Sequence, residues 1–298
     1  MGRTEQKMAA EGEMDASTMS VAAGMVTYNP DLSDLETNIP SILDQCGHLV
    51  IVDNGSERIE AMEALCARYS NLVLIRNGRN LGIAAALNQV FAWAGNRGFR
   101  WVLTLDDDSC PPGTMLQEYR EYLAHTTGKR VGIVCPLLEN RRDGTVFHSK
   151  RSEDECITSG SLTSVEAWRS LGGFDEWLFI DGVDFDFSRR LVSAGYSIEE
   201  CRSVLMPHQI GQSRTIHILG RNPIIWNHSA FRQFYIQRNA IYIDYKLGTY
   251  SLASSLRRFL KDLVFVLIWE DDKRAKVSSM VRGWRAGMAK IRRMKHPS

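Results

Sequence analysis

Residues 101–109 read Trp-Val-Leu-Thr-Leu-Asp-Asp-Asp-Ser, an apolar run that ends in three consecutive aspartates. The apolar part predicts a buried strand, so Asp106, Asp107 and Asp108 follow that strand directly. Like charges this close repel, and they stay ionised together only if a positive group lies among them. Ligands of open α/β sheets bind at the carboxyl ends of strands, and carboxylates suit Mg²⁺ or Mn²⁺. The alternative is an acidic turn that caps the next helix, since Ser109-Cys110-Pro111-Pro112 comes next.

Apolar runs alternate with segments of helical period through roughly the first 200 residues. The predicted strands cover residues 21–26, 48–52, 72–76, 100–105 and 131–135, and the predicted helices cover residues 31–45, 58–69, 83–94, 114–125 and 165–171. This alternation predicts an α/β fold with a mainly parallel sheet and helices on both faces. The strands are continuous apolar runs, as expected for strands that are covered on both sides.

Composition narrows the classes of function. The chain has 298 residues, and its 36 Lys and Arg nearly balance its 35 Asp and Glu, which argues against a nucleic-acid binder. Six cysteines form no CxxC pair, which argues against a zinc site or a disulfide framework and fits a reducing cytoplasm. Residues 1–20 are polar and lack the apolar core of a signal peptide, so we expect a disordered leader. The composition therefore favours a cytoplasmic location.

The C-terminal region 229–298 is predicted to be helical and amphipathic. One apolar stripe at i, i+3 and i+4 spacing comprises Leu252, Leu256, Phe259, Leu260, Leu263, Val264, Leu267 and Ile268. A second stripe comprises Val277, Met280, Val281, Trp284, Met288 and Ile291. The accompanying basic residues are Arg257, Arg258, Lys261, Arg282, Arg285, Lys290, Arg292 and Arg293. Such helices suit the surface of an anionic membrane, and they equally suit packing on each other or across a homo-oligomer interface.

Further polar motifs follow the predicted strands or lie downstream of the aspartates. In chain order they are Thr27-Tyr28-Asn29-Pro30, Val52-Asp53-Asn54-Gly55-Ser56, Arg79-Asn80-Leu81-Gly82-Ile83-Ala84, Leu105-Asp106-Asp107-Asp108-Ser109, Thr158-Ser159-Gly160-Ser161, Gly172-Gly173-Phe174-Asp175-Glu176, Phe179-Ile180-Asp181-Gly182-Val183-Asp184-Phe185-Asp186 and His208-Gln209-Ile210-Gly211. Each also has an ordinary structural interpretation as a turn or a helix cap. Together and in this order, the motifs resemble the GT-A glycosyltransferases of family 2, and within them the bacterial rhamnosyltransferases. The resemblance extends from about residue 21 to residue 245 and implies a Rossmann-like nucleotide-binding sheet.

The resemblance implies roles for the strand-end residues. The expected nucleotide-binding residues are Thr27, Asn29, Asp53, Asn80, Gly82 and Asp106. The expected ligands of a divalent metal, Mg²⁺ or Mn²⁺, are Asp106, Asp108 and His208. We expect Asp108 to bind the metal directly and Asp106 to lie nearer the ribose. Relatives often have Gln where this chain has Asp107, to which we assign no role.

The second acidic cluster is expected to supply the base. Inverting transfer needs a carboxylate within hydrogen-bond reach of the acceptor hydroxyl, and the resemblance implies Asp184, although Val183 stands where the family has Glu. N-terminal capping of a helix is the alternative role for Asp184. Candidates for holding the diphosphate are Arg214, Arg221 and Arg238. Candidates for contacting the acceptor are Trp177, Asp181, Gly160 and Ser161.

The resemblance implies an inverting hexosyltransferase that moves L-rhamnose from dTDP-β-L-rhamnose to a hydroxyl of a glycan. We expect the glycan to be lipid-linked and to belong to bacterial surface polysaccharide synthesis, so the protein would lie on the inner face of the plasma membrane. The expected domains are a catalytic domain at 21–228, with a nucleotide-sugar half at 21–110 and an acceptor half at 111–228, and the helical region 229–298. The alternatives are a family-2 transferase that uses a UDP-hexose or UDP-galactofuranose, and a catalytically inactive scaffold at the membrane.

Overall fold

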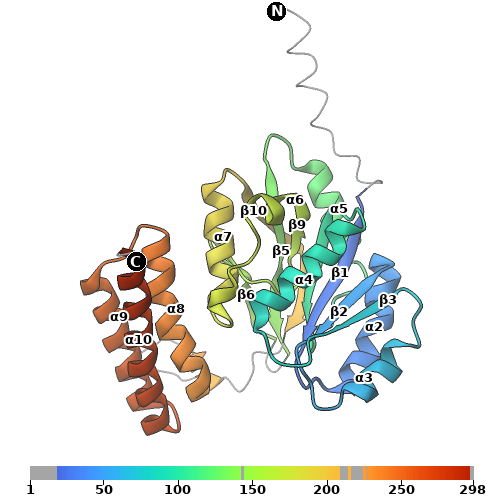
Figure 1. The fold of residues 1–298 in the computed structure, drawn as a ribbon. Coiled ribbons are helices and arrows are strands. Elements are labelled where there is room, and N and C mark those ends of the chain that lie inside the picture. Colours follow the sequence, from blue (N-terminus) through green and yellow to red (C-terminus); the bar gives the residue numbers. More distant parts are fainter. Residues whose placement is uncertain (1–18, 142–143, 209–213, 216–223, 226, 296–298) are drawn as a thin grey trace, which may run out of the picture. The chain divides into compact units, whose positions relative to one another are not determined.

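The computed structural model describes residues 19–295, apart from residues 142–143, 209–213, 216–223 and 226 (Figure 1). The chain divides into two compact units, and each is described here by itself. Unit 1 comprises Met1–Glu176 and Phe187–Gln209, and unit 2 comprises Trp177–Asp186 and Ile210–Ser298. Of the predicted leader only residues 19 and 20 are described, and Met19 is buried in the core of unit 1.

An 8-stranded sheet forms the centre of unit 1. Its strands are β1 (Val21–Thr27), β2 (Leu49–Asp53), β3 (Leu72–Arg76), β4 (Trp101–Asp106), β5 (Val131–Asn140), β6 (Val146–His148), β9 (Leu162–Ser164) and β10 (Ser197–His208). They are ordered β10-β5-β9-β4-β1-β2-β3, and β6 pairs with β5. β1 pairs in parallel with β2 and β4, as do β2 with β3 and β5 with β10. The predicted α/β fold with a mainly parallel sheet is confirmed.

Helices cover both faces of this sheet (Figure 1). They are α2 (Leu32–Cys46), α3 (Ile59–Cys66), α4 (Ile83–Asn96), α5 (Met115–His125) and α6 (Val165–Ser170). Along β1, Ala23 and Met25 join the core cluster that includes Leu35 of α2. Gly24 points to the other face, where a side chain at this position would overlap Val90 of α4. The burial of both faces explains why β1 lacks the polar–apolar alternation of a half-exposed strand.

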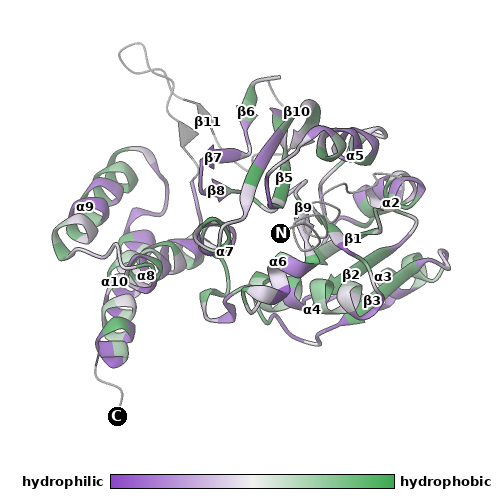
Figure 2. Ribbon diagram, turned by 90° about the horizontal axis from the view of Figure 1, so that it is seen from above, coloured by the Kyte–Doolittle hydropathy of each residue, from purple (hydrophilic) through white to green (hydrophobic). Residues whose placement is uncertain are grey.

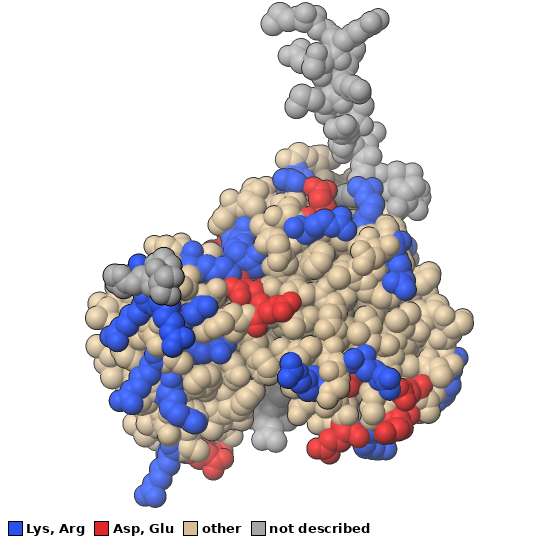
Figure 3. Space-filling view, viewed as in Figure 1, with Lys and Arg blue, Asp and Glu red and all other residues tan. Residues whose placement is uncertain are grey.

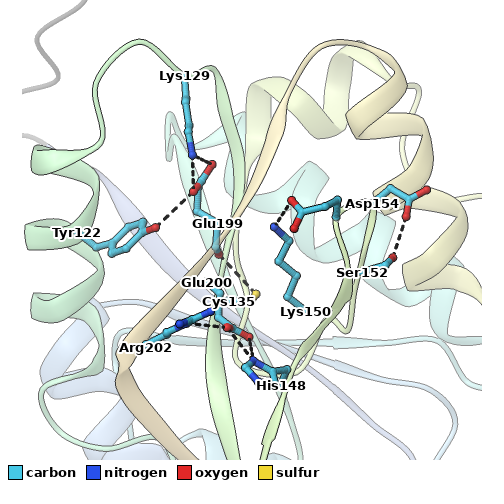
Figure 4. Close-up of polar contacts among 11 residues, drawn as sticks. Tyr122, Lys129, Cys135, His148, Lys150, Ser152, Asp154, Glu199, Glu200 and Arg202 are labelled. Carbon is cyan, nitrogen blue, oxygen red and sulfur yellow. Dashed lines mark hydrogen bonds and ion pairs between the residues drawn. The ribbon is translucent and has the colours of Figure 1, made fainter.

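One end of the sheet departs from the simple alternation of strands and helices. β9 is short and lies antiparallel between β4 and β5, and the predicted polar stretch contains β6 and the small pair β7 (Lys150–Ser152) and β8 (Glu155–Cys156). β10 at the end of the strand order carries charged side chains that are paired, as Figure 4 shows. Burial opposes ionisation of Glu199, but its bonds from Lys129 at 2.9 and 3.0 Å prevail and lower its pKa. Charges on an outer strand discourage pairing with another chain.

Unit 2 is a segment at 177–186 together with three long helices. The segment contains all but the first residue of the short turn η2 (Glu176–Leu178) and the start of α7 (Val183–Ser193). The helices are α8 (Ala230–Lys246), α9 (Leu252–Trp269) and α10 (Lys273–Lys295). α10 lies so close against α8 that side chains at Gly283 and Gly287 would overlap the α8 backbone at Phe234 and Arg238. A buried ion pair between Lys276 and Glu270, 2.9 Å long, joins the ends of α9 and α10. The two short strands β11 (Arg214–Thr215) and β12 (Ile224–Ile225) also belong to this unit.

Candidate active site

Three residues predicted for the site lie at one edge of the sheet in unit 1. β1 lies between β2 and β4, with Thr27 opposite Asp53 and Val26 opposite Asp106. Because these strands are parallel and in this register, their carboxyl ends lie at the same level. The turns that follow them are therefore brought together, as their positions after predicted strands indicated.

Asp53 is buried, and its own turn engages both of its carboxylate oxygens. Oδ2 accepts hydrogen bonds from the N–H groups of Gly55 and Ser56, each at 3.0 Å. Oδ1 accepts from the Ser56 hydroxyl and, at 3.3 Å, from the Thr27 hydroxyl. A carboxylate offers about four lone-pair positions, so these four hydrogen bonds fill the accepting capacity of Asp53. Asp53 holds the turn in this structure, and its contact with a nucleotide base stays a prediction.

Asn54, which the sequence analysis did not assign to the site, organises the neighbouring turn. Its Oδ1 accepts from the Leu81 N–H at 3.0 Å, and its Nδ2 donates to Asn80 Oδ1 at 3.1 Å. Asn80 Oδ1 also accepts from the Gly82 N–H at 2.9 Å. Gly82 has a φ of 90° immediately before α4, a conformation that favours glycine. The buried amide of Asn54 and the amide of the exposed residue Asn80 thus fix the start of α4 at the sheet edge.

Asn29 ties the turn after β1 to the turn after β2. Its N–H donates to the Ser56 hydroxyl at 2.8 Å, and its Oδ1 accepts from the Glu57 N–H at 2.8 Å. Its φ of 52° is one that Asn adopts more readily than most residues. The side chain therefore acts within the protein, and its predicted contact with the nucleotide is additional to this role.

The three aspartates form a tight turn at the end of β4. The Asp106 N–H donates to the Ser109 hydroxyl, and the Ser109 N–H donates to the Asp106 carbonyl, both at 3.0 Å. Ser109 is fully buried, which anchors the turn in unit 1. Burial, followed by the charges of Asp108 and Asp106, raises the pKa of Asp107 to about 6. The turn thus concentrates negative charge in partly buried surroundings.

These carboxylates suit a hard divalent cation. Oxygen ligands are those that Mg²⁺ and Mn²⁺ prefer, and a cation would relieve the mutual repulsion that, after burial, raises the pKa of Asp107. Within the described part of the chain, no three His, Cys, Asp or Glu side chains are arranged to hold a metal ion. Mg²⁺ commonly uses one or two protein carboxylates and completes its shell with water and substrate phosphates. The turn fits that kind of site.

Gly160 and Ser161 lie in a turn that supports the end of β4. The Gly160 N–H donates to the Thr104 carbonyl at 2.8 Å, and a side chain at Gly160 would approach Met206 Sδ to 2.7 Å. Ser161 is buried, and its hydroxyl donates to the Ile157 carbonyl at 2.6 Å. These contacts favour a structural role for both residues over the predicted direct contact with an acceptor.

In unit 2, Asn239 of α8 holds the segment that precedes the predicted base. Asn239 is buried, and its Nδ2 lies within hydrogen-bond distance of the carbonyls of Leu178 at 2.9 Å, Ile180 at 2.7 Å and Asp181 at 2.7 Å. The segment needs such support, because Phe179 and Asp181 have φ angles of 65° and 64°. Positive φ is uncommon for residues other than glycine.

Two ion pairs from the same helix hold the segment on either side of Asn239. Arg232 binds Asp181 with Nε at 3.1 Å from Oδ1, and Lys246 lies 2.8 Å from Asp186, which is fully buried. Arg232, Asn239 and Lys246 are spaced by seven residues, which places them on one face of α8. That regular spacing of polar residues is the signal from which they could have been found in the sequence.

The predicted base, Asp184, lies in the first turn of α7. Its Oδ1 accepts from the Phe185 N–H at 3.0 Å, and the side chain is partly exposed. The positive end of the helix dipole favours an ionised carboxylate here. Both predicted roles of Asp184, as base and as helix cap, are compatible with this position.

The remaining predicted residues have different surroundings. Arg238 lies 4.0 Å from the centre of the Trp177 ring and donates to the carbonyls of Trp177 and Leu178 at 2.6 and 2.9 Å. These contacts give both side chains a structural role in unit 2. For His208, at the end of β10, and Arg214, at the start of β11, only the backbone is described. Arg221 lies outside the described residues.

Comparison with known proteins adds to this geometry. A model of glycosyl transferase family 2 matches residues 23–176, which is more than half of the chain. The chain belongs to glycosyl transferase family 2. It is 28% identical over 265 residues to the dTDP-rhamnosyl transferase RfbF of Shigella flexneri, covering 84% of this chain and 86% of that one. It is also 25% identical to the galactofuranosyltransferase GlfT1 of Mycolicibacterium smegmatis, covering 70% and 78% of the two chains.

A solved structure agrees with this membership at the level of the fold. The mannosyltransferase PcManGT of Pyrobaculum calidifontis, in complex with GDP-Man and Mn²⁺, matches with a TM-score of 0.57 at 16% identity, covering 91% of this chain and 75% of that one. The predicted family is therefore confirmed, and the protein is a glycosyltransferase with the GT-A fold. A nucleotide-sugar donor and a glycan acceptor follow from this class.

Proposed function

We propose that the protein is a divalent-metal-dependent, inverting rhamnosyltransferase. It would move L-rhamnose from dTDP-β-L-rhamnose to a hydroxyl of a lipid-linked glycan, with an α-rhamnosyl linkage as the product. The observation that carries the proposal is the cluster of three carboxylates at the end of β4, where burial and like charge raise the pKa of Asp107 to about 6. The likeness to a dTDP-rhamnosyl transferase over most of both chains supports the donor.

In this proposal the carboxylates of the two acidic clusters have different roles. Asp108, with Asp106 and His208, would hold Mg²⁺ or Mn²⁺, and Asp106 would also lie toward the ribose. When bound, the metal offsets charge that develops on the departing diphosphate. Asp184 would take the proton from the acceptor hydroxyl as its oxygen attacks the anomeric carbon on the side opposite the diphosphate. Its place in the first turn of α7 supports this role, because the helix end favours the ionised form.

The test is the substitution Asp184→Asn, which keeps the shape of the side chain and removes its basicity. Transfer from dTDP-rhamnose to a defined glycan acceptor should be abolished, while dTDP binding, measured by calorimetry, should stay within a few-fold of wild type. A chelator should stop transfer by the wild-type protein, and Mg²⁺ or Mn²⁺ should restore it. Turnover of Asp184→Asn at the wild-type rate would overturn the assignment of the base.

Glu166→Gln is the matched control for this test. Glu166 is also an acidic residue in the first turn of a helix, and its side chain is 73% exposed with a surface ion pair to Arg130. A general effect of removing negative charge from a helix N-terminus would appear in both variants. Loss of transfer in Asp184→Asn alone indicates a specific chemical role.

An alternative candidate for the donor is UDP-galactofuranose, which the likeness to a galactofuranosyltransferase favours. Incubating the protein with dTDP-rhamnose, UDP-galactofuranose and a UDP-hexose separately, and measuring transfer or hydrolysis, distinguishes these donors. If none is consumed and neither dTDP nor UDP binds with or without metal, the protein is a scaffold that retains only the fold of a transferase.

A further inference from the structure

The helix α9 presents an apolar face to solvent. Six aliphatic side chains on this helix are between 47% and 56% exposed: Leu252, Leu256, Leu260, Val264, Leu267 and Ile268. The first four are spaced by four residues, and the last two extend the same side of the helix. Green bands recur along α9 in Figure 2, which colours the chain by hydropathy. We call these six residues the α9 face.

Unit 2 uses the opposite side of α9 for its own packing, and that side contains polar groups. Ser255 is buried and accepts a hydrogen bond from Trp284 Nε1 at 3.3 Å. Asp262 accepts from Gln237 Nε2 at 2.9 Å, and Arg258 pairs with Asp244 at 2.7 Å. A helix on the surface of a globular protein ordinarily turns its apolar stripe to the core and its charges to water. α9 leaves six aliphatic side chains in solvent, while its packed side combines these polar groups with apolar residues such as Val266 and Phe259. An exposed apolar face of this kind is typical of a surface that binds something else.

The charges along the α9 face itself are positive, and the exposed acidic residues Asp271 and Asp272 follow beyond its C-terminal end. Arg257 and Lys261 are exposed along its border, whereas Asp262, the one acidic residue within α9, is bonded to Gln237 on the packed side. The helix α10 of the same unit has nine Lys and Arg and no Asp or Glu, and most of the nine are exposed. Blue side chains gather over this part of the molecule in Figure 3. An apolar face with positive borders complements a surface that is apolar inside and anionic at its rim.

We propose that the α9 face docks into the headgroup region of a bilayer that contains anionic lipid. The helix would lie in the plane of the surface, with its aliphatic side chains among the upper acyl carbons and with Arg257 and Lys261 at the phosphates. No helix among the described residues is long and apolar enough to cross a membrane.

Charge also argues for lipid over a second copy of this chain. A two-fold interface places the same surface of both subunits face to face. Such an interface would bring Arg257 and Lys261 of both subunits together along the α9 face, whereas the exposed acidic residues Asp271 and Asp272 lie beyond its C-terminal end. Anionic headgroups supply the missing negative charge.

The experiment is sedimentation of the full-length protein with vesicles of phosphatidylcholine, with and without phosphatidylglycerol. Wild type should sediment with the anionic vesicles, and added salt should weaken the binding. The double variant Leu256→Ser/Leu260→Ser should weaken it by about tenfold or more, because two aliphatic side chains no longer leave water. The pair Arg257→Gln/Lys261→Gln should weaken it by about tenfold on anionic vesicles, with little change on neutral ones.

Val146→Ser is the matched control, because Val146 is a 50% exposed aliphatic residue on β6 of unit 1. It should bind vesicles as wild type does. All the changed side chains are exposed or partly exposed, so the variants should unfold at the wild-type temperature. Equal vesicle binding by wild type and the Leu256→Ser/Leu260→Ser variant overturns the proposal. So does a wild-type dimer in lipid-free solution that this variant converts to a monomer, because a second copy then covers the face.

This inference rests on the proposed function in one respect only. The proposed function supplies the purpose of membrane binding, which is to hold the enzyme near a lipid-linked acceptor. The two fail in different ways. Variants of the α9 face should retain transfer to a water-soluble acceptor, and Asp184→Asn should retain vesicle binding. A wild-type protein that transfers rhamnose but does not bind anionic vesicles overturns only this inference, and one that binds the vesicles but transfers no sugar overturns only the proposed function.

Discussion

Two segments that carry acidic residues of the predicted site are held in opposite ways. The turn after β2 is fixed from within, because Asp53 accepts from N–H groups two and three residues further along the chain. The segment before α7 is fixed from a distance, because the Asn239 side chain reaches carbonyls 58 to 61 residues earlier. The first geometry can form as soon as its strand forms, whereas the second exists only when α8 has packed.

The distant arrangement also has to offset strained backbone. Phe179, Asp181 and Gly182 have φ angles of 65°, 64° and 81°, and only the last of these residues adopts such angles freely. The contacts from α8 therefore do more than orient the segment. We expect the segment before α7 to be the more sensitive of the two to a single substitution.

The largest effect is expected for Asn239→Ala. It leaves three carbonyls without their amide donor at a buried position, and we expect the free energy of unfolding to fall by about 3 kcal/mol. Transfer activity should fall as well, because Asp184 follows this segment. Urea denaturation and the transfer assay measure the two effects.

Two further variants test the explanation of that loss. Asn239→Asp keeps the size of the side chain but has no amide donor, so it should be about as destabilising. Asn71→Ala removes an amide with one carbonyl partner, Gly47, at an exposed position and should cost less than about 1 kcal/mol. If Asn239→Ala is as mild as Asn71→Ala, α8 does not hold the segment in the way we describe.

A smaller effect, about 2 kcal/mol of stability, is expected for Asp53→Asn. In the variant, the NH₂ group of the amide faces donors that in wild type face a carboxylate oxygen. At least one charge-assisted hydrogen bond is therefore lost. Thermal unfolding measures the change. Asp31→Asn, which alters an exposed cap of α2, should cost clearly less.

The same variant tests the predicted nucleotide contact of Asp53. If Asp53→Asn is destabilised and still binds dTDP with wild-type affinity once folded, the residue holds the turn only. If stability is unchanged and dTDP binding is lost, Asp53 contacts the nucleotide and our account of the turn is wrong.

The difference between local and distant contacts explains which features could be predicted from the sequence. The strands and their polar ends were predictable because apolar runs, Asn-Gly and Asp-Asp-Asp are local signals, and parallel strands bring their ends to one edge. The seven-residue spacing of Arg232 and Lys246 indicates one face of α8, but it does not identify their partners, which lie 51 and 60 residues away. The stripe on α9 was visible as a period, but a period does not say whether the apolar side meets the protein or solvent. β9 was missed because three residues are too few to show a pattern.

The smallest effect is expected for Asp107→Asn, and its sign should be the opposite of that for Asp53→Asn. The pKa of Asp107 is raised from 3.8 to about 6 in the folded protein, first by burial and then by Asp108 and Asp106. Between these values the folded state binds more protons than the unfolded state, so stability falls as pH rises through this interval and stays lower above it. With a chelator present, the Asn variant should therefore be more stable than wild type above pH 6. The gain should be about 1 kcal/mol after allowance for screening by solvent, and it should vanish below pH 3.8, where the wild-type carboxyl is protonated in both states.

Urea denaturation of both proteins across this pH range measures the difference. Asp53→Asn would then destabilise the turn after β2, where the carboxylate accepts four hydrogen bonds. Asp107→Asn would stabilise the turn after β4, where the carboxylate has like-charged neighbours. Adding Mg²⁺ and dTDP should reduce the advantage of the variant, since a bound cation relieves the repulsion among the wild-type carboxylates. An Asn variant that is less stable than wild type without metal would mean that the protein itself compensates the charge of Asp107. The crowded carboxylates at the end of β4 would then give no reason to expect a metal site there.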